Sequence, residues 1–313
     1  MTGGAGFIGS HLVSSLSHAG HAVRILDNFS GIGSKGRAST LSDLNNVQII
    51  EGDIRVDSDC HAAVQGADYI LHHAAEPSVA RSVEDPATCA DVNVGGTINM
   101  LTAASNTTGI RGFVFASSCA VYGDTAEDEK SESGPNDPLT PYATTKLAGE
   151  YFCRNFQQLR GVPTISLRYF NVYGPGQDPN GAYAAVIPKF LTAVANGKRP
   201  IIYGDGEQSR DFIFVDDIVR ANLCAVESAG SVAGRTFNIG GGAHTSLNVL
   251  VQKLESILDR EINPERVDRK NGDILHSRAN ISRAAEHLNF IPTVSLDDGL
   301  ARTLHWYTVS TPS

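Results

Sequence analysis

Short apolar runs alternate with segments of helical periodicity along most of the chain. The apolar runs lie at 22–26, 47–50, 67–71, 112–115 and 164–168, and the longest helical patterns cover 86–105 and 142–160. Strands that alternate with helices at this spacing favour right-handed crossovers and a parallel sheet. We therefore predict an α/β fold with a doubly wound parallel sheet.

A Pro/Gly-rich stretch at 174–181 predicts the first passage of the chain into a second lobe. A helical pattern at 184–195 and an apolar run at 201–203 follow, and the chain then returns towards the sheet. We expect residues 1–173, with a return at about 211–240, to form the larger domain. Residues 174–210 and 241–313 are expected to form a smaller C-terminal α/β lobe.

Three glycines, Gly3, Gly6 and Gly9, lead into a helical pattern, and the apolar run that follows ends at Asp27. Glycines at this spacing allow a tight turn and a close approach of the backbone to a pyrophosphate at the helix N-terminus. An acid about 20 residues further on accepts the adenosine ribose hydroxyls and repels a 2′-phosphate. The pattern predicts a Rossmann-type domain that binds NAD rather than NADP; the alternative is a plain glycine-rich turn.

The strand that should precede this glycine loop is almost absent, because only Met1 and Thr2 stand before it. We interpret the first strand as truncated, either in the protein itself or through a late start of the sequence. A missing central strand exposes the edges of its neighbours and the floor of the cofactor site. We expect the chain to be less stable than one extended by a β-strand.

A serine, a tyrosine and a lysine stand where chemistry on an alcohol needs them. Ser118 follows an apolar run, and open α/β sheets place their ligands at the carboxyl ends of strands. Tyr142 and Lys146 are four residues apart, so they share one face of a helix. We expect the ammonium to favour the phenolate and to lower the pKa of the tyrosine below its reference value of about 10. The three residues are candidates for acid–base catalysis.

Composition narrows the class of protein. The 313 residues are 41% hydrophobic and 19% charged, with a net charge of −9, which argues against a nucleic-acid or acidic-membrane partner. The five cysteines include no C-x-x-C pair and read as reduced thiols, and no apolar run is long enough for a membrane span. His72 and His73 are adjacent and lack a third ligand, so we expect no metal site. The absence of a signal-peptide pattern favours the cytoplasm.

An ordered set of motifs runs nearly the length of the chain. The motifs are TGGAGFIGSHL, LDNFS, GDI, ASSCAVYGD, PYATTK, LRYFNVYGPGQ, GDGEQSRDFIFVDD, FNIGGG and GDILHS. With them the chain resembles the extended short-chain dehydrogenase/reductase superfamily, and within it the UDP-sugar 4-epimerases. The resemblance implies that NAD is held by Gly3, Gly6, Phe7, Ile8, Gly9, Asp27, Asn28, Asp53, Ile54, Ala74, Ala75 and Lys146.

The same resemblance implies a UDP-sugar in the smaller lobe and a reaction at C4 of the sugar. Tyr142 would remove the O4 proton while the C4 hydride passes to NAD, Ser118 would bind O4, and the 4-keto sugar would turn over before the hydride returns. The implied substrate contacts are Ser78, Ser118, Tyr142, Asn171, Tyr203, Arg210, Lys270, Asp273 and Ser277. The guanidinium of Arg210 suits a diphosphate, although an ion pair with nearby acids would also explain it. Lys270 stands where the family usually has an arginine, and Arg269 is a possible substitute.

Two residues after Ser118 disfavour related reactions. Nucleotide-sugar 4,6-dehydratases carry an Asp-Glu pair at the positions of Cys119 and Ala120, and alanine cannot act as a base. The same absence counts against the UDP-glucuronate decarboxylases. We interpret Cys119 as a small packing residue beside the sugar.

Ser277 bears on the choice of sugar. In the epimerases this position borders the C2 substituent, where a large aromatic residue excludes an N-acetyl group and serine leaves room. The segment 178–189 and the segment 77–82 also resemble epimerases that act on N-acetylated sugars. We therefore expect UDP-GlcNAc and UDP-GalNAc as substrates, with UDP-glucose and UDP-galactose as further ones.

Two other functions stay open at this stage. One is 4-epimerisation of UDP-hexuronic acids, which needs a cation or hydroxyl cluster near C6 that the sequence does not locate. The other is a non-catalytic NAD-sensing protein on the same fold, which is expected to lack at least one of Ser118, Tyr142 and Lys146. All three are present. The resemblance also implies a homodimer that pairs the helices at 86–105 and 142–160.

Overall fold

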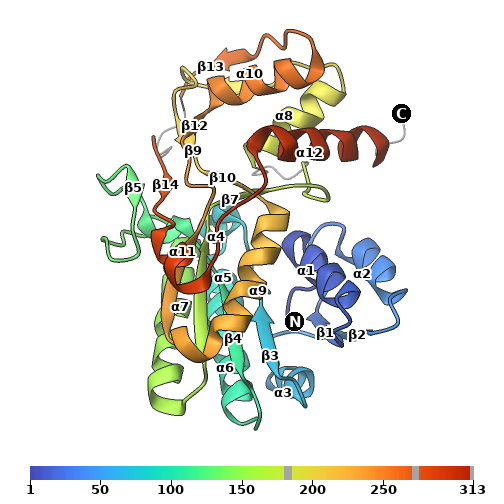
Figure 1. The fold of residues 1–313 in the computed structure, drawn as a ribbon, viewed down its shortest axis with the longest axis vertical. Helices are drawn as coiled ribbons and strands as arrows, with labels where there is room; N and C mark the ends of the chain where they lie inside the picture. Colours follow the sequence, from blue (N-terminus) through green and yellow to red (C-terminus); the bar gives the residue numbers. More distant parts are fainter. Residues whose placement is uncertain (180–184, 270–274, 311–313) are drawn as a thin grey trace.

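The structure is a computed structural model that describes residues 1–179, 185–269 and 275–310. Figure 1 shows a sheet with helices on both faces and a group of helices and short strands beyond one end of it. None of the described helices is both long and apolar enough to cross a bilayer.

Parallel strands form the centre of the larger part. Four of them lie in the order β11-β6-β4-β3, and two more, β1 and β2, pair beside them. Their bounds are β1 (Val23–Asp27), β2 (Val47–Glu51), β3 (Tyr69–His72), β4 (Gly112–Ser118), β6 (Thr164–Tyr169) and β11 (Arg235–Ile239). Every residue of β6 is buried, as expected for a strand covered on both faces. The predicted α/β fold with a parallel sheet is confirmed.

Met1, Thr2 and Gly3 occupy the place of a strand between β1 and β3. Thr2 bridges in parallel to Leu26 on one side and to His72 on the other. Its N–H donates to the Leu71 carbonyl at 3.0 Å, and the Leu26 N–H donates to the Met1 carbonyl at 2.8 Å. The central strand is therefore reduced to a short connection that joins the two groups of strands.

An N-terminal extension is expected to raise the thermal midpoint of unfolding. Four or five apolar residues before Met1 would continue the connection between β1 and β3, and each added hydrogen bond stabilises by about 1 kcal/mol. The Met1 amine is buried and its pKa falls to about 5, so converting it to a peptide group also removes a desolvation cost. We expect a rise of at least about 5 °C by calorimetry. A Gly/Ser extension of equal length is the control, and equal midpoints for both would contradict the prediction.

Helices cover both faces of the sheet. The helices of the larger part are α1 (Phe7–His18), α2 (Ser34–Ser42), α3 (Asp57–Val64), α4 (Val79–Glu84), α5 (Pro86–Ala90), α6 (Gly96–Ser105), α7 (Pro141–Arg160), α9 (Val215–Val232) and α11 (Ser282–Leu288). The helix expected over 86–105 is divided into α5 and α6 by a π-helical turn at Asp91–Gly95. Helices α1, α9 and α11 pack on one face, and α3, α6 and α7 on the other.

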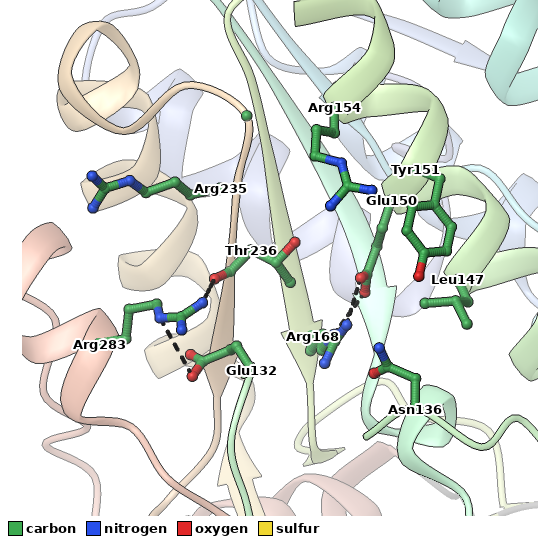
Figure 2. Close-up of a pocket in the computed structure, with 11 residues that line it drawn as sticks. Glu132, Asn136, Leu147, Glu150, Tyr151, Arg154, Arg168, Arg235, Thr236 and Arg283 are labelled. Atoms are coloured by element: carbon green, nitrogen blue, oxygen red, sulfur yellow. Dashed lines mark hydrogen bonds and ion pairs between the residues drawn. The ribbon is translucent and has the colours of Figure 1, made fainter. Parts of the chain in front are cut away.

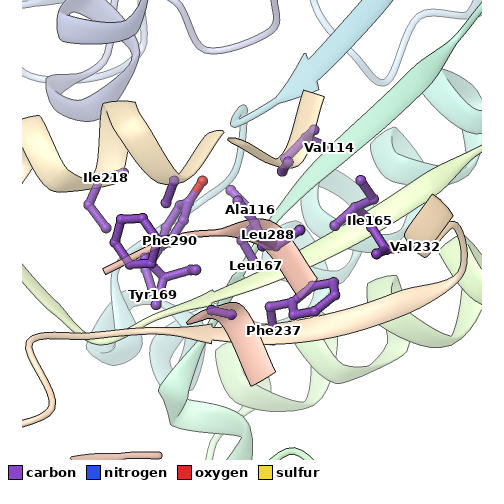
Figure 3. Close-up of a cluster of buried hydrophobic side chains, with 14 of the residues drawn as sticks. Val114, Ala116, Ile165, Leu167, Tyr169, Ile218, Val232, Phe237, Leu288 and Phe290 are labelled. Carbon is purple, nitrogen blue, oxygen red and sulfur yellow. The ribbon is translucent and has the colours of Figure 1, made fainter. Parts of the chain in front are cut away.

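The largest core cluster lies under α9 and α11 (Figure 3). Val114 and Leu167 from the strands meet Ile218 of α9, and Leu288 and Phe290 close the cluster from the C-terminal region. Residues 282–290 thus pack on the sheet, although the predicted division assigns them to the smaller lobe.

The smaller group has its own apolar cluster, built on α8 (Val186–Ala195), α10 (Leu247–Leu258) and α12 (Leu296–Ser310). Short strands pair outside the main sheet: β8 (Ile201–Tyr203) with β13 (Glu265–Val267), β9 (Ser209–Arg210) with β12 (Thr245–Ser246), β10 (Phe212–Phe214) with β7 (Asn171–Tyr173), and β14 (Arg278–Ala279) with β5 (Glu129–Lys130). Figure 1 places α8, α10 and α12 together beyond one end of the sheet. We propose that this group forms the substrate lobe.

Candidate active site

The glycine loop has the shape of a pyrophosphate cradle. Gly3 has φ +66°, and a Cβ there would lie 2.7 Å from the Ala74 nitrogen. A Cβ on Gly9 would overlap the Gly3 carbonyl, so both positions need glycine. Gly6 caps α1 without a side-chain hydrogen bond, which leaves the first N–H groups of the helix to be satisfied by something other than a capping side chain. The loop fits a dinucleotide at the N-terminus of α1.

The other residues predicted to line this loop lie close to it. Phe7 and Ile8 are the first residues of α1 and are half-buried. Ala74 and Ala75 follow β3, and the Ala74 N–H donates to Thr2 Oγ1 at 3.1 Å. The loop and the end of β3 therefore form one continuous wall.

Asp27 at the end of β1 is held by two backbone N–H groups, from Ala5 and Phe29, each at 2.9 Å. Asn28 Nδ2 donates to Asp53 Oδ2 at 2.9 Å, so two of the residues predicted for the adenosine are in contact. The Arg55 guanidinium holds the pKa of Asp53 well below its usual range. These contacts preorganise the acidic end of the proposed cofactor site.

Ile54 differs from its neighbours because its side chain is only 4% exposed. It packs so closely against Gly96 that a Cβ at that glycine would overlap it. The Ile54 side chain therefore presents little surface to an adenine ring.

The serine, tyrosine and lysine come together at the carboxyl end of β4. Ser118 is the last residue of β4, and its hydroxyl lies near enough to Tyr142, at the start of α7, to oppose the rise in the pKa of that phenol. Lys146 is buried one turn further along, with its Nζ 5.9 Å from the Tyr142 ring centroid and donating to the Ala116 carbonyl at 2.9 Å. The structure thus places the predicted catalytic residues in one group.

The start of α7 is fixed by local capping. Thr140 accepts a hydrogen bond from the Ala143 N–H at 3.3 Å, and Pro141 occupies the first turn. The Tyr142 N–H donates to Ser82 Oγ at 3.1 Å. These contacts set the position of Tyr142 relative to β4.

The pKa values depart from the prediction. Burial raises the pKa of Tyr142 to about 12, although the hydrogen bond from Ser118 opposes the shift. Burial also lowers the pKa of Lys146 to about 8. The prediction that Lys146 lowers the pKa of Tyr142 below 10 is wrong for the protein alone, because burial of the phenol dominates and the opposing influence comes from Ser118.

Several residues predicted to contact substrate lie in or beside the smaller lobe. Arg210 Nη1 donates to the Ser209 carbonyl at 2.9 Å and to the Leu275 carbonyl at 3.5 Å, which brings Arg210 beside the segment that carries Ser277. Asn171 Nδ2 donates to the Asp211 carbonyl at 2.9 Å. Tyr203 ends β8 with 37% of its surface exposed.

The other residues predicted to contact substrate lie in separate parts of the chain. Ser78 caps α4 and accepts from the Arg81 N–H at 3.2 Å, and Ser277 is half-buried just before β14. Lys270 and Asp273 lie outside the described residues, as do residues 180–184 of the segment that resembles epimerases of N-acetylated sugars.

Sequence reasoning missed Asp211, a buried carboxylate between β9 and β10. It accepts hydrogen bonds from the N–H groups of Gly241 at 2.6 Å, Gly242 at 3.0 Å and Ala279 at 2.9 Å. Burial raises its pKa to about 6. Its position directly after Arg210 was the only signal, because the three donors come from segments far away in the sequence.

Cys119, His72 and His73 are held in buried positions, where packing and hydrogen bonds account for them. Burial raises the pKa of Cys119 to about 12 and lowers that of His73 to about 4. His72 contacts Thr2 Oγ1 at 2.8 Å and Thr97 Oγ1 at 3.0 Å through its two ring nitrogens. Among the described residues, no group of three or more ligating side chains could hold a metal ion.

Comparison with known proteins identifies the family. Residues 1–240 match the model of the NAD dependent epimerase/dehydratase family. A UDP-glucose 4-epimerase of Mycolicibacterium smegmatis is 38% identical, over 98% of this chain and 97% of its own length.

Two solved structures have the same fold. The UDP-N-acetylglucosamine 4-epimerase of Methanobrevibacter ruminantium, in complex with UDP-N-acetylmuramic acid, superposes with a TM-score of 0.93 at 37% identity, over 99% of this chain and 97% of that one. The UDP-glucuronic acid 4-epimerase of Bacillus cereus, with UDP-glucuronic acid and NAD, has a TM-score of 0.89 at 31% identity, over 99% and 98%. With its glycine loop, its Ser–Tyr–Lys group and this match over most of its length, the chain belongs to the NAD dependent epimerase/dehydratase family, and its cofactor is NAD.

Proposed function

We propose that the protein interconverts the C4 epimers of a UDP-hexose. The observation that carries the proposal is the grouping of Ser118, Tyr142 and Lys146 at the end of β4, with Lys146 buried and its Nζ 5.9 Å from the Tyr142 ring centroid. This group adjoins a loop shaped for NAD, and the similar proteins named above are 4-epimerases of UDP-sugars.

Each side chain of the proposed site has a separate role in the reaction. Tyr142 removes the proton from the sugar O4 and returns it later, and Ser118 holds O4 by a hydrogen bond. Lys146 supplies positive charge beside the phenol. NAD, which the glycine loop and Asp27 would hold, would supply the hydride acceptor and donor for C4 of the sugar. Arg210 binds the diphosphate, so that the nucleotide carries the affinity and the sugar can turn.

The residues after Ser118 support epimerisation over dehydration. Cys119 and Ala120 form the short helix that follows β4, and no acid stands at either position. Burial raises the pKa of the Cys119 thiol, in keeping with a small packing residue beside the sugar.

UDP-GlcNAc and UDP-GalNAc are the substrates that we favour, with UDP-glucose and UDP-galactose accepted as well. Ser277 is small and half-buried. It lies two residues after Leu275, whose carbonyl accepts a hydrogen bond from Arg210. A pocket with serine at this point has room for an N-acetyl group. The likeness to the Methanobrevibacter enzyme supports the same choice.

A UDP-hexuronic acid is the second candidate, favoured by the likeness to the Bacillus cereus enzyme. One experiment separates the candidates. The purified protein is incubated with UDP-glucose, UDP-GlcNAc or UDP-glucuronic acid without added reductant, and the anomeric protons are followed by NMR. We expect the C4 epimers of the first two; an epimer from the uronate alone would favour the second candidate, and no epimer from any would contradict the proposal.

The pH dependence should reveal the role of Lys146. Tyr142 acts as a base only as the phenolate, so the rate is expected to rise with pH through the pKa of this phenol. Since the pKa of Lys146 is lowered to about 8, its ammonium can favour the phenolate only below that pH; there Lys146→Met should lower the rate, which moves the rise upward by about one pH unit or more. The measurement is the initial rate at saturating NAD across the pH range. Lys253→Met, which removes an exposed ion pair with Asp297 in the smaller lobe, is the control. A rise at the same pH in the Lys146 variant would show that the ammonium does not tune the phenol.

A further inference from the structure

A cavity of about 230 Å³ lies between α7, β6, the start of β11 and α11 (Figure 2). One water takes roughly 30 Å³ in the liquid, so the space is large enough for a small molecule. The charged lining consists of four arginines and two glutamates: Arg154, Arg168, Arg235, Arg283, Glu132 and Glu150.

Both carboxylates of the lining are already engaged. Glu150 accepts from Arg168 Nε at 2.8 Å and Nη2 at 2.7 Å, and from the Ser117 hydroxyl. Glu132 accepts from the Asn238 N–H at 2.8 Å and pairs with Arg283 at 3.7 Å. The cavity therefore carries a positive charge in a chain whose net charge is −9.

Two polar atoms of the lining residues are buried without a hydrogen-bond partner. One is Nη1 of Arg168, a residue that is only 3% exposed and whose guanidinium lies over the Tyr122 ring, 4.6 Å from its centroid; the other is Oδ1 of Asn136. Figure 2 shows both side chains on the same wall of the cavity. A buried donor on a guanidinium and a buried amide oxygen are each costly to leave unsatisfied. The first calls for an anionic oxygen and the second for a proton donor.

We propose that this cavity is a binding site for a small oxyanion that also carries a hydroxyl group, of the class of hydrogen phosphate and small hydroxylated phosphate esters. An anionic oxygen accepts from Arg168 Nη1, and the guanidinium groups of Arg154 and Arg283 add charge-assisted contacts. The hydroxyl donates to Asn136 Oδ1. The occupant stabilises the group of Ser117, Glu150 and Arg168, which adjoins Ser118 along β4.

Inorganic phosphate is the probe. The full-length protein is loaded with NAD and saturated with UDP, so that phosphate cannot enter the proposed nucleotide site, and phosphate binding is measured by calorimetry at constant ionic strength. We expect one saturable site, with sulfate about tenfold weaker because it carries no proton at neutral pH. Equal affinities for phosphate and sulfate would overturn the role of Asn136, and no binding of either would overturn the site.

Substitutions of the lining arginines test whether phosphate binds in this cavity. Arg154→Gln and Arg283→Gln are each expected to weaken phosphate about tenfold, and their thermal midpoints report that they fold. Arg168 itself is avoided because its loss would leave Glu150 buried without its cation. Arg160→Gln, an exposed arginine at the end of the same helix and outside the lining, is the matched control. If all three variants bind phosphate as the unchanged protein does, the anion sits elsewhere and the proposal fails.

Discussion

Tyr142→Phe is expected to lower kcat for epimerisation by about a thousandfold or more. A positioned general base contributes about 10²–10⁴ to a rate, and here the same phenol must take the O4 proton and give it back. The change removes one hydroxyl, whose partner is Ser118, so the fold and the retention of NAD should persist. The measurement is the epimerisation rate by NMR at saturating substrate, with bound NAD quantified in each preparation.

Tyr151→Phe is the matched control for this variant. Tyr151 lies on the same helix, is 45% exposed and does not belong to the catalytic group, so its loss should leave kcat within about twofold. A Tyr142→Phe protein that keeps more than about a tenth of the activity would show that another group is the base.

Ser277→Tyr is expected to change the choice of sugar. If Ser277 borders the C2 substituent, a phenol ring there fills the space of an N-acetyl group and leaves a hydroxyl unaffected. We expect kcat/KM to fall about a hundredfold or more for UDP-GlcNAc and to stay within about threefold for UDP-glucose. Parallel NMR assays with the two substrates measure the ratio.

Ser277→Ala separates the size of this residue from its hydroxyl. Alanine keeps the pocket open, so both substrates should turn over at nearly the rates of the unchanged protein. Equal losses for the two sugars in the tyrosine variant would indicate a general disturbance of the segment before β14, and unchanged turnover of both would remove Ser277 from the pocket.

Local spacing was enough to predict part of the molecule. The spacing of the glycines is local, because a Cβ on Gly9 would overlap the Gly3 carbonyl six residues earlier, although the close approach of Gly3 to Ala74 depends on β3. Tyr142 and Lys146 meet because they are four residues apart on one helix. The alternation of apolar runs and helical patterns likewise predicted the parallel sheet.

Contacts between segments that are far apart in the chain could not be predicted from the sequence. Asp211 binds the backbone at Gly241, Gly242 and Ala279, and no local pattern reports a carboxylate whose donors are 30 residues or more away. The pairing of Glu150 with Arg168 and Ser117, and the cavity beside it, depend on how α7 packs on β4 and β6.

The sequence by itself determined the fold class and the cofactor loop, because both follow from periodicity and short-range spacing, and it indicated the candidate catalytic residues through the resemblance of the motifs that carry them. Only the tertiary structure decided the electrostatic state of those residues. The pKa of Tyr142 depends on how much water the packed chain removes from the phenol, and the sequence contains the lysine but not the burial. The same reason holds for Thr2, whose place between β1 and β3 is set by strands that lie about 20 and 70 residues further along the chain.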